Sequence, residues 1–306
     1  MSGAAIKEDE ARGEEMMLCA SCGTAGSDDI KLMKCTACYL VSYCSVKCQK
    51  DHESKHKKAC RRRAAELRDE LLFEQPESNH HGDCPICCVP LPLDSSKSTL
   101  YTCCCKTICN GCDYANFIRE VEGRLQQKCP FCRKAAPKTD EGCIEQLMKR
   151  IEANDPVAMC SMGKVRCKEG EYNAAFEYWT RAAALGDIEA HYEVSLLYRE
   201  GRGVEKDEKK ELYHFEQAAI EGHPMARHNL GVMEWRKGRL DRAAKHFIIA
   251  AYLGDDASLK CVKDLYKAGL VRKDDFATAL RGHEATNSPQ REEAAEFHAE
   301  RKRRGI

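Results

Sequence analysis

The cysteines constrain this chain more than any other feature. Seventeen of its 21 cysteines precede residue 133, mostly in pairs separated by two residues. The chain has 306 residues and a polar, acidic N-terminal segment, whereas a secreted disulfide scaffold is small and begins with a signal peptide. In a reducing compartment, paired cysteines usually hold metal. The pattern therefore predicts a cytoplasmic or nuclear protein whose front half is folded around metal ions.

The first cluster offers eight ligands, enough for two tetrahedral zinc sites. They are Cys19, Cys22, Cys35, Cys38, Cys44, Cys48, His56 and Cys60. A two-residue spacing lets a tight turn direct two thiolates at one ion, whereas a three-residue spacing places two ligands on one face of a helix. We therefore expect loops under the C-x2-C pairs. Short helices are expected to carry Cys44 with Cys48 and His56 with Cys60.

The segment YCSVKCQKDH and the ligands that follow it resemble the MYND zinc finger over residues 19 to 60. The resemblance implies interleaved sites, with Cys19, Cys22, Cys44 and Cys48 on one zinc and Cys35, Cys38, His56 and Cys60 on the other. His52 stands where the family usually has tryptophan, and we expect it to pack rather than to bind metal. The resemblance also implies a module that binds short client peptides.

The second cluster, residues 83 to 135, resembles a RING finger because it begins with CPIC and ends with CPFC. The resemblance implies that Cys84, Cys87, Cys109 and Cys112 hold one zinc. The other zinc takes Cys129, Cys132 and two ligands from the run TCCCK. Lys106 replaces the usual histidine, and a charged ammonium group cannot coordinate zinc.

Two pairs of cysteines in that run compete for the second zinc. Side chains two residues apart in an extended chain point the same way, which favours Cys103 with Cys105. The resemblance favours Cys103 with Cys104, and this is the pair that we predict. Cys105 and Cys88 are then free thiols, and the chain binds four zinc ions, two per finger.

Three positions of the second finger match the surface by which RING fingers hold a ubiquitin-conjugating enzyme: Ile86, Pro130 and Arg133. The resemblance implies that a RING acts by positioning the loaded enzyme. We therefore predict a RING-type ubiquitin ligase, with the conjugating enzyme and client peptides as partners. The alternative is a non-catalytic zinc-finger and repeat scaffold, and a transcription-associated factor is a third hypothesis.

Charge and hydropathy argue against other partners. The chain has 49 basic and 49 acidic residues, so no global charge attracts it to nucleic acid. The longest apolar run, FIIAAYL, is far shorter than the roughly 20 residues that span a bilayer. We expect neither a membrane nor a nucleic acid as a partner.

The back half repeats a helical unit. The segments AAALGD, AAIEGHP and AAYLGDD close three units, and the middle unit resembles the Sel-one-like repeat, a tetratricopeptide relative. Glycine at Gly186, Gly222 and Gly254 suits the left-handed position at which a helix ends, and Asp187 and Asp255 can cap the next helix. The resemblance implies a right-handed solenoid of about four helix pairs that binds proteins.

The predicted fold is therefore a pair of small zinc-stabilised α+β fingers, MYND and RING-like, followed by an all-α Sel-one-like helical solenoid. The predicted order is a disordered tail (1–15), the MYND finger (16–62), a linker helix and hinge (63–82), the RING-like finger (83–135), a linker helix (136–155), the repeats (156–285) and a polar tail (286–306). We expect the histidines of the repeats to be core or solvated residues, and Trp179 and Trp235 to pack between helices.

Overall fold

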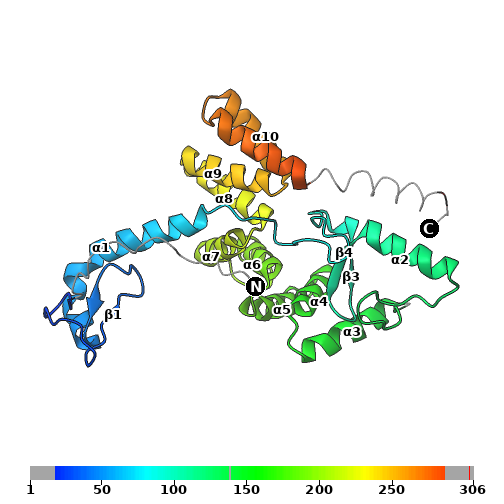
Figure 1. Ribbon diagram of the computed structural model, residues 1–306, viewed down its shortest axis with the longest axis horizontal. Helices are drawn as coiled ribbons and strands as arrows, with labels where there is room; N and C mark the ends of the chain where they lie inside the picture. Colours follow the sequence, from blue (N-terminus) through cyan, green and yellow to red (C-terminus); the bar gives the residue numbers. More distant parts are fainter. Residues whose placement is uncertain (1–17, 138, 287–302, 304–306) are drawn as a thin grey trace. The chain divides into compact units, whose positions relative to one another are not determined.

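The computed structural model describes residues 18–137, 139–286 and 303 (Figure 1). The predicted tail at 1–15 and most of the predicted tail at 286–306 lie outside these residues. The chain divides into two compact units, Met1–Leu72 and Phe73–Ile306.

The first unit is a small finger that runs into a long helix. Strand β1 (Met33–Lys34) pairs antiparallel with β2 (Ser42–Tyr43), and α1 (Val46–Leu72) follows. The expected short helices and separate linker helix are instead one helix of 27 residues. It contains neither glycine nor proline, so the backbone has no reason to break between the finger and the arginine-rich stretch after Cys60.

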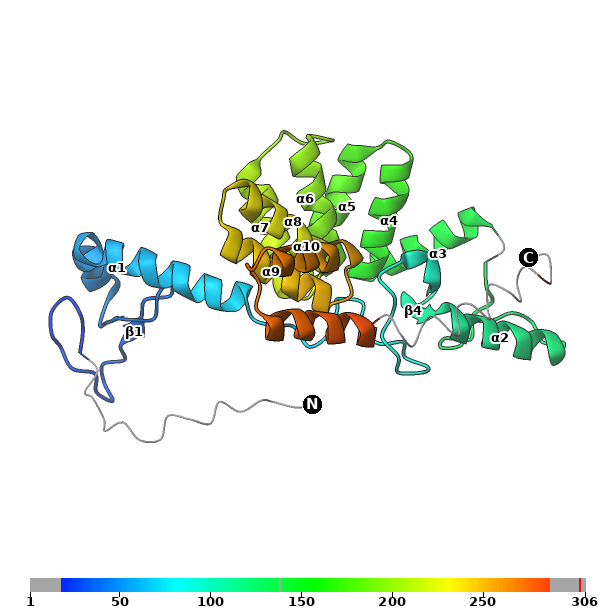
Figure 2. The same ribbon diagram turned by 90° about the horizontal axis from the view of Figure 1, so that it is seen from above.

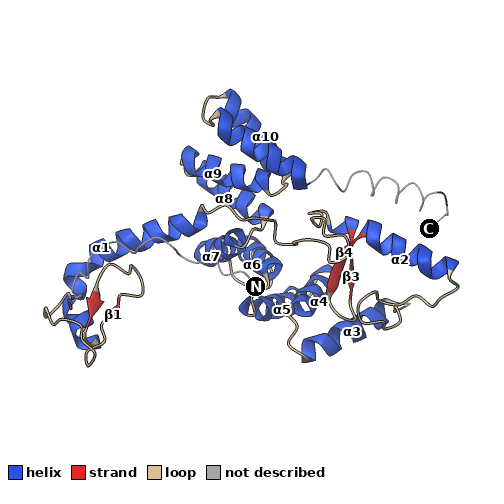
Figure 3. Ribbon diagram, viewed as in Figure 1, coloured by secondary structure: helices blue, strands red, loops and turns tan. Residues whose placement is uncertain are grey.

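The second unit begins with another finger. The 3-10 turn Ser95–Lys97 leads into β3 (Ser98–Tyr101), which pairs antiparallel with β4 (Lys106–Cys109), and α2 (Asn110–Glu122) follows directly. The named strands, red in Figure 3, all belong to the two cysteine-rich segments of the sequence. The core of this finger is small: Leu91 and Ile108 are buried beside two cysteines, and Tyr101 and Phe131 are partly buried against them. Such a core is too small to stabilise the fold without metal.

Helices make up the rest of the second unit, and consecutive helices pack side by side (Figure 2). They are α3 (Asp140–Glu152), α4 (Pro156–Lys168), α5 (Tyr172–Ala184), α6 (Ile188–Glu200), α7 (Glu208–Ile220), α8 (Pro224–Arg236), α9 (Leu240–Tyr252), α10 (Asp256–Lys267) and a further helical stretch at 273–286. Among the described residues, none of the helices has both the length and the hydrophobicity of a bilayer span. The predicted fold class, zinc fingers followed by an all-α solenoid, is confirmed.

The signals at the helix boundaries act as the sequence predicts. Gly186, Gly222 and Gly254 have φ angles of 86°, 84° and 101°, a region that favours glycine. Asp187 accepts a hydrogen bond from the backbone N–H of Ala190 at 2.7 Å and so caps α6. These residues end one helix and start the next within three positions, which keeps neighbouring helices antiparallel.

Close packing inside the solenoid depends on small residues. The Trp179 side chain is only 1% exposed, and its indole N–H donates to the Cys160 carbonyl oxygen at 3.1 Å. A Cβ on Gly163 would lie 2.5 Å from the Trp179 Nε1 atom, so only glycine fits there. The matching expectation for Trp235 is wrong, because its side chain is 47% exposed near the end of α8.

Candidate metal centres

Four C-x2-C turns share one backbone geometry. In each, the residue after the second cysteine donates its backbone N–H to the carbonyl oxygen of the first cysteine, at 2.8 to 3.1 Å, and that residue has a positive φ. The donors are Gly23, Tyr39, Cys88 and Arg133, and the acceptors are Cys19, Cys35, Cys84 and Cys129. The tight turn brings the two sulfurs of each pair to the same side of the backbone. A pair built this way supplies half of a tetrahedral site.

The first finger completes two such sites. One ligand atom from each of Cys19, Cys22, Cys44 and Cys48 lies within 4.8 Å of the others, and the same holds for Cys35, Cys38, His56 and Cys60. These are the two interleaved sets that the MYND resemblance implies. The second site uses α1, which carries both His56 and Cys60.

The distances within these sets fit zinc and do not fit disulfides. The Sγ atoms of Cys22 and Cys44 are 3.5 Å apart, and those of Cys35 and Cys60 are 3.8 Å apart. A tetrahedral ion with Zn–S bonds of about 2.3 Å separates its sulfurs by about 3.8 Å, whereas a disulfide bond is about 2.05 Å long. One set offers four sulfur donors and the other offers three sulfurs and one imidazole nitrogen, and both combinations are those of structural zinc sites.

His52 takes no part in these sets. Its Nδ1 atom lies 3.2 Å from the Tyr43 hydroxyl, and its ring stacks on that of His56 with the centroids 5.9 Å apart. The ring therefore supports the ligand His56 from the side, which agrees with the expected packing role. Tyr43 itself is buried.

The second finger gathers the eight cysteines that the sequence singled out. Cys84, Cys87, Cys109 and Cys112 form one group, and Cys103, Cys104, Cys129 and Cys132 form the other. The Sγ atoms of Cys87 and Cys109 are 3.8 Å apart, and those of Cys104 and Cys129 are 3.6 Å apart. The two groups interleave along the chain, in the cross-braced order that the RING resemblance implies.

Cys105 lies outside both groups. Its φ is 53°, and its N–H donates to the Tyr101 carbonyl oxygen at 2.8 Å, so the chain turns sharply there. The argument from extended geometry does not apply, because the run between β3 and β4 is a turn rather than a strand. The Cys105 side chain instead packs against the group of buried apolar residues that runs from α3 to α6 of the solenoid.

Backbone hydrogen bonds prepare some of the thiols for metal. N–H groups near Cys22 and Cys44 lower the pKa of Cys19 to about 6, which favours the thiolate at neutral pH. In the second finger, burial is the largest cause that raises the pKa of Cys109 to about 11. A bound cation would reverse that balance, because a metal-bound thiol loses its proton.

The three predicted partner-binding residues lie at the surface of the second finger. Ile86 is 46% exposed and sits between two ligands of the first group. Pro130 is half-buried and Arg133 is exposed, on the turn that begins at Cys129. Two of the three side chains are thus exposed, and the third is partly so.

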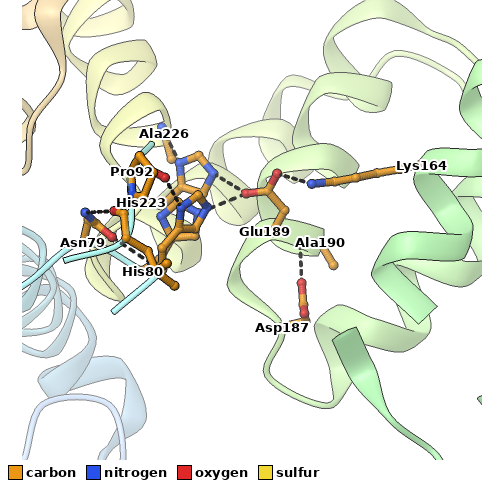
Figure 4. Close-up of polar contacts among 11 residues, drawn as sticks. Asn79, His80, Pro92, Lys164, Asp187, Glu189, Ala190, His223 and Ala226 are labelled. Carbon is orange, nitrogen blue, oxygen red and sulfur yellow. Dashed lines mark hydrogen bonds and ion pairs between the residues drawn. The ribbon is translucent and has the colours of Figure 1, made fainter. Parts of the chain in front are cut away.

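Sequence reasoning missed a polar cluster that joins the segment before the second finger to the solenoid. Figure 4 shows Glu189 between three partners. Its Oε2 atom accepts from His80 Nε2 at 3.0 Å and from His223 Nε2 at 3.1 Å, and its Oε1 atom accepts from Lys164 Nζ at 2.6 Å. No local pattern could reveal it, because His80 and Glu189 are 109 positions apart.

The same cluster contains a candidate three-ligand cation site at His80, His81 and Glu189. Both Glu189 oxygens are already hydrogen-bonded, and His81 Nδ1 lies 2.9 Å from the Pro92 carbonyl oxygen. Lys164 places a positive charge where a metal ion would bind. We therefore assign the cluster a structural role, since it holds residues expected to form a flexible hinge against α6 and α8.

Comparisons with known proteins place names on two parts of the chain. A family model for the MYND finger matches residues 19–60, and a model for the Sel1 repeat matches residues 156–187, 188–223 and 224–255. The three Sel1 matches correspond to the helix pairs α4–α5, α6–α7 and α8–α9.

The chain is similar to a protein of Rattus norvegicus named DAP3-binding cell death enhancer 1, with 25% identity over 57% of this chain and 41% of that protein. It is also similar to the Mus musculus protein of the same name, with 24% identity over 50% of this chain and 38% of that protein. The chain thus spans about two fifths of the length of these curated relatives.

Among solved structures, a Sel1 repeat protein from Oxalobacter formigenes has 20% identity and a TM-score of 0.40, over 57% of this chain and 71% of that one. The protective antigen c5321 of uropathogenic Escherichia coli has 20% identity and a TM-score of 0.34, over 62% of this chain and 39% of that one. By the two family models, the chain contains a MYND finger, which implies zinc binding, and Sel1 repeats, and both are modules of protein interaction.

Proposed function

We propose that this chain is a non-catalytic scaffold in which the MYND finger and the Sel1 array each bind a protein, and the second, RING-like finger joins the two. The observation that carries the proposal is the register of the repeats. Three Sel1 matches coincide with three helix pairs, so residues 156–255 form an uninterrupted array of the kind that binds proteins. The name of the rat relative states that it binds another protein, which is in keeping with this role.

The metal in this proposal is structural. Each finger has too few apolar residues for a core, and apparent zinc-binding energies of about 10–16 kcal/mol supply the folding energy instead. Four ions, two per finger, would occupy the four groups of ligands described above. Zinc supplies no chemical step; it holds the turns on which residues such as Ile86 and Arg133 are displayed.

A second candidate function is that of a ubiquitin ligase, and one specific observation favours it. Ile86 and Arg133 are exposed on the two turns where a RING finger would hold a conjugating enzyme. The comparisons favour the scaffold, because the modules that they name bind proteins without transferring a group. The conjugating enzyme therefore belongs to this alternative only.

One assay separates the two functions. Purified full-length chain is incubated with ubiquitin, activating enzyme and a panel of conjugating enzymes, beside the Arg133→Ala and Ile86→Ala variants. The scaffold proposal predicts the same background of ubiquitin chains for all three proteins. If the wild type forms ubiquitin chains and both variants fail to form them at unchanged zinc content, the ligase is established and the proposal is refuted.

A further inference from the structure

The segment between α1 and the second finger lies on the solenoid like a bound peptide. Residues 73–82, which we call the strap, form hydrogen bonds and ring contacts with α6, α8 and α9 and with the turn before α8. The solenoid side chains that hold it form the strap surface: Glu189, His223, Arg227, Arg242, Lys245 and His246.

An aromatic ring anchors one end of the strap. The Phe73 ring lies 4.8 Å from the His246 ring, measured between centroids. The Arg242 guanidinium carbon is 4.8 Å from the Phe73 centroid and the Lys245 Nζ atom is 5.2 Å from it. Cations at these distances are attracted to an aromatic face. This end of the surface therefore selects an aromatic side chain.

Backbone atoms near both ends of the strap make further contacts. Arg227 is fully buried, and its Nη2 atom donates to the Glu74 carbonyl oxygen at 3.3 Å. The His80 N–H donates to the Gly222 carbonyl oxygen at 3.1 Å. A Cβ on Gly222 would lie 2.7 Å from the Ser78 carbonyl oxygen, so the glycine lets the strap approach. Backbone contacts of this kind accept any segment that can follow this path and do not depend on its side chains.

The other end is fixed by the hydrogen bond from His80 to Glu189 at 3.0 Å. His223 accepts the Ala226 N–H through its Nδ1 atom at 3.3 Å, so its Nε2 atom carries the proton that it donates to Glu189. The Glu189 carboxylate thus offers a hydrogen-bond acceptor to the segment that lies against α6. Phe73 and His80 are seven residues apart, a span of at most roughly 25 Å when extended.

Two observations indicate that the strap is an imperfect occupant. His246 is 1% exposed, yet neither of its ring nitrogens has a hydrogen-bond partner within the described part of the chain. A buried polar group without a partner is rare in native proteins, and the Phe73 ring offers it nothing. In addition, Glu74, Gln75, Glu77 and Ser78 are exposed, so the strap is attached mainly at its ends.

We propose that the strap surface is a peptide-binding site that the strap fills in cis. Its partners are acidic segments that can follow the bent path of the strap, with an aromatic anchor and, about seven residues later, a hydrogen-bond donor for Glu189. The acidic preference follows from Arg227, Arg242 and Lys245, which lie under a strap that itself carries Glu74 and Glu77; Glu234 offsets part of the charge through its ion pair with Arg242. A tyrosine anchor places a hydroxyl near His246. This inference deepens the proposed scaffold function by naming a site and a class of partner.

The test uses a fluorescent peptide with the sequence of residues 73–82, FEQPESNHHG, and full-length protein with its zinc. A tethered strap competes at an effective concentration in the millimolar range. We therefore expect polarisation to report at least tenfold tighter binding to the Phe73→Ala/His80→Ala variant than to the wild type. In that background, Lys245→Glu should weaken binding severalfold, whereas Lys260→Glu, an exposed lysine of α10, should not. A peptide with tyrosine in place of phenylalanine should bind more tightly.

Three outcomes would overturn the inference, and a fourth would remove one part of it. The released variant, folded by circular dichroism and with unchanged zinc content, does not bind the peptide, or the wild type binds it equally well. If the released variant fails to fold, the strap is part of the solenoid core. Equal affinity of the phenylalanine and tyrosine peptides removes the role given to His246. The scaffold proposal survives each of these results, because it is tested by the ubiquitination assay.

Discussion

Exchanging single cysteines in the run 103–105 tests which of them bind metal. Cys104 Sγ lies 3.6 Å from Cys129 Sγ inside a group of four, whereas Cys105 belongs to no such group and its Sγ atom lies 3.9 Å from the Thr102 carbonyl oxygen. Replacing either by serine changes one atom and leaves the backbone unaltered. Cys104→Ser should therefore disrupt a zinc site, and Cys105→Ser should not.

The expected loss of zinc affinity follows from dividing the binding energy equally among the four ligands. An apparent zinc-binding energy of about 10–16 kcal/mol over four ligands gives about 3 kcal/mol per thiolate. Its loss weakens zinc binding by about a hundredfold, since 1.4 kcal/mol is a factor of ten. Cys105 is half-buried against the solenoid, and its replacement by serine should lower the free energy of unfolding by about 1 kcal/mol or less.

The assay is zinc content by mass spectrometry after dialysis against a weak chelator, followed by a colorimetric zinc-release titration. We expect four ions per chain in the wild type and in Cys105→Ser, and three in Cys104→Ser. The reverse pattern would show that the ligands are Cys103 and Cys105. Four ions in both variants would remove Cys104 from the site altogether.

Three further predictions concern the rest of the molecule. Stripping all zinc with a strong chelator should abolish the order of both fingers while most of the helical circular-dichroism signal remains, and an unchanged finger region in NMR spectra would contradict this. Gly163→Ala forces a Cβ against Trp179 and should destabilise the solenoid by about 1–3 kcal/mol in urea unfolding; an unchanged midpoint would mean that the helices move apart freely. Burial, then repulsion from His223, lowers the pKa of His80 to about 4, below the roughly 6.5 of a free histidine. The docked strap therefore binds fewer protons than the released strap. Its docking is fully stable above about pH 6.5 and weakens as the pH falls towards 4. The other charged and titratable groups beside His80 are Glu189, Lys164, His81 and His223. We expect hydrogen exchange at the His80 amide to accelerate at pH 5 relative to exchange at the Gly201 amide.

Patterns confined to a few neighbouring residues were readable from the sequence. The C-x2-C pairs predict tight turns because two thiolates must reach one ion, and the structure brings together the groups predicted for both fingers. Gly186 and Asp187 mark a helix boundary because one residue needs a positive φ and the next caps with its side chain. These features depend on local chemistry, which is visible in the order of residues.

Features that depend on distant contacts were not readable. The polar stretch around Asn79 and His80 has the composition of a hinge, and only Glu189, far along the chain, makes it a fixed segment. The sequence predicts short helices in place of the long helix α1, because the spacing of the ligands indicates single helical turns and not the length of the helix that contains them. Trp235 illustrates the opposite error, since a large apolar residue can remain at a surface without penalty to the fold.

The turn geometry of the fingers has a consequence for what the surface displays. Arg133 donates its backbone N–H to Cys129, a ligand, and has a φ of 61°, so the conformation that aims its side chain outward is the one that closes the loop around the ion. Without zinc, that loop relaxes and the arginine loses its fixed direction. Availability of the metal would thus control how this side chain is displayed, long before any helix of the array begins to melt.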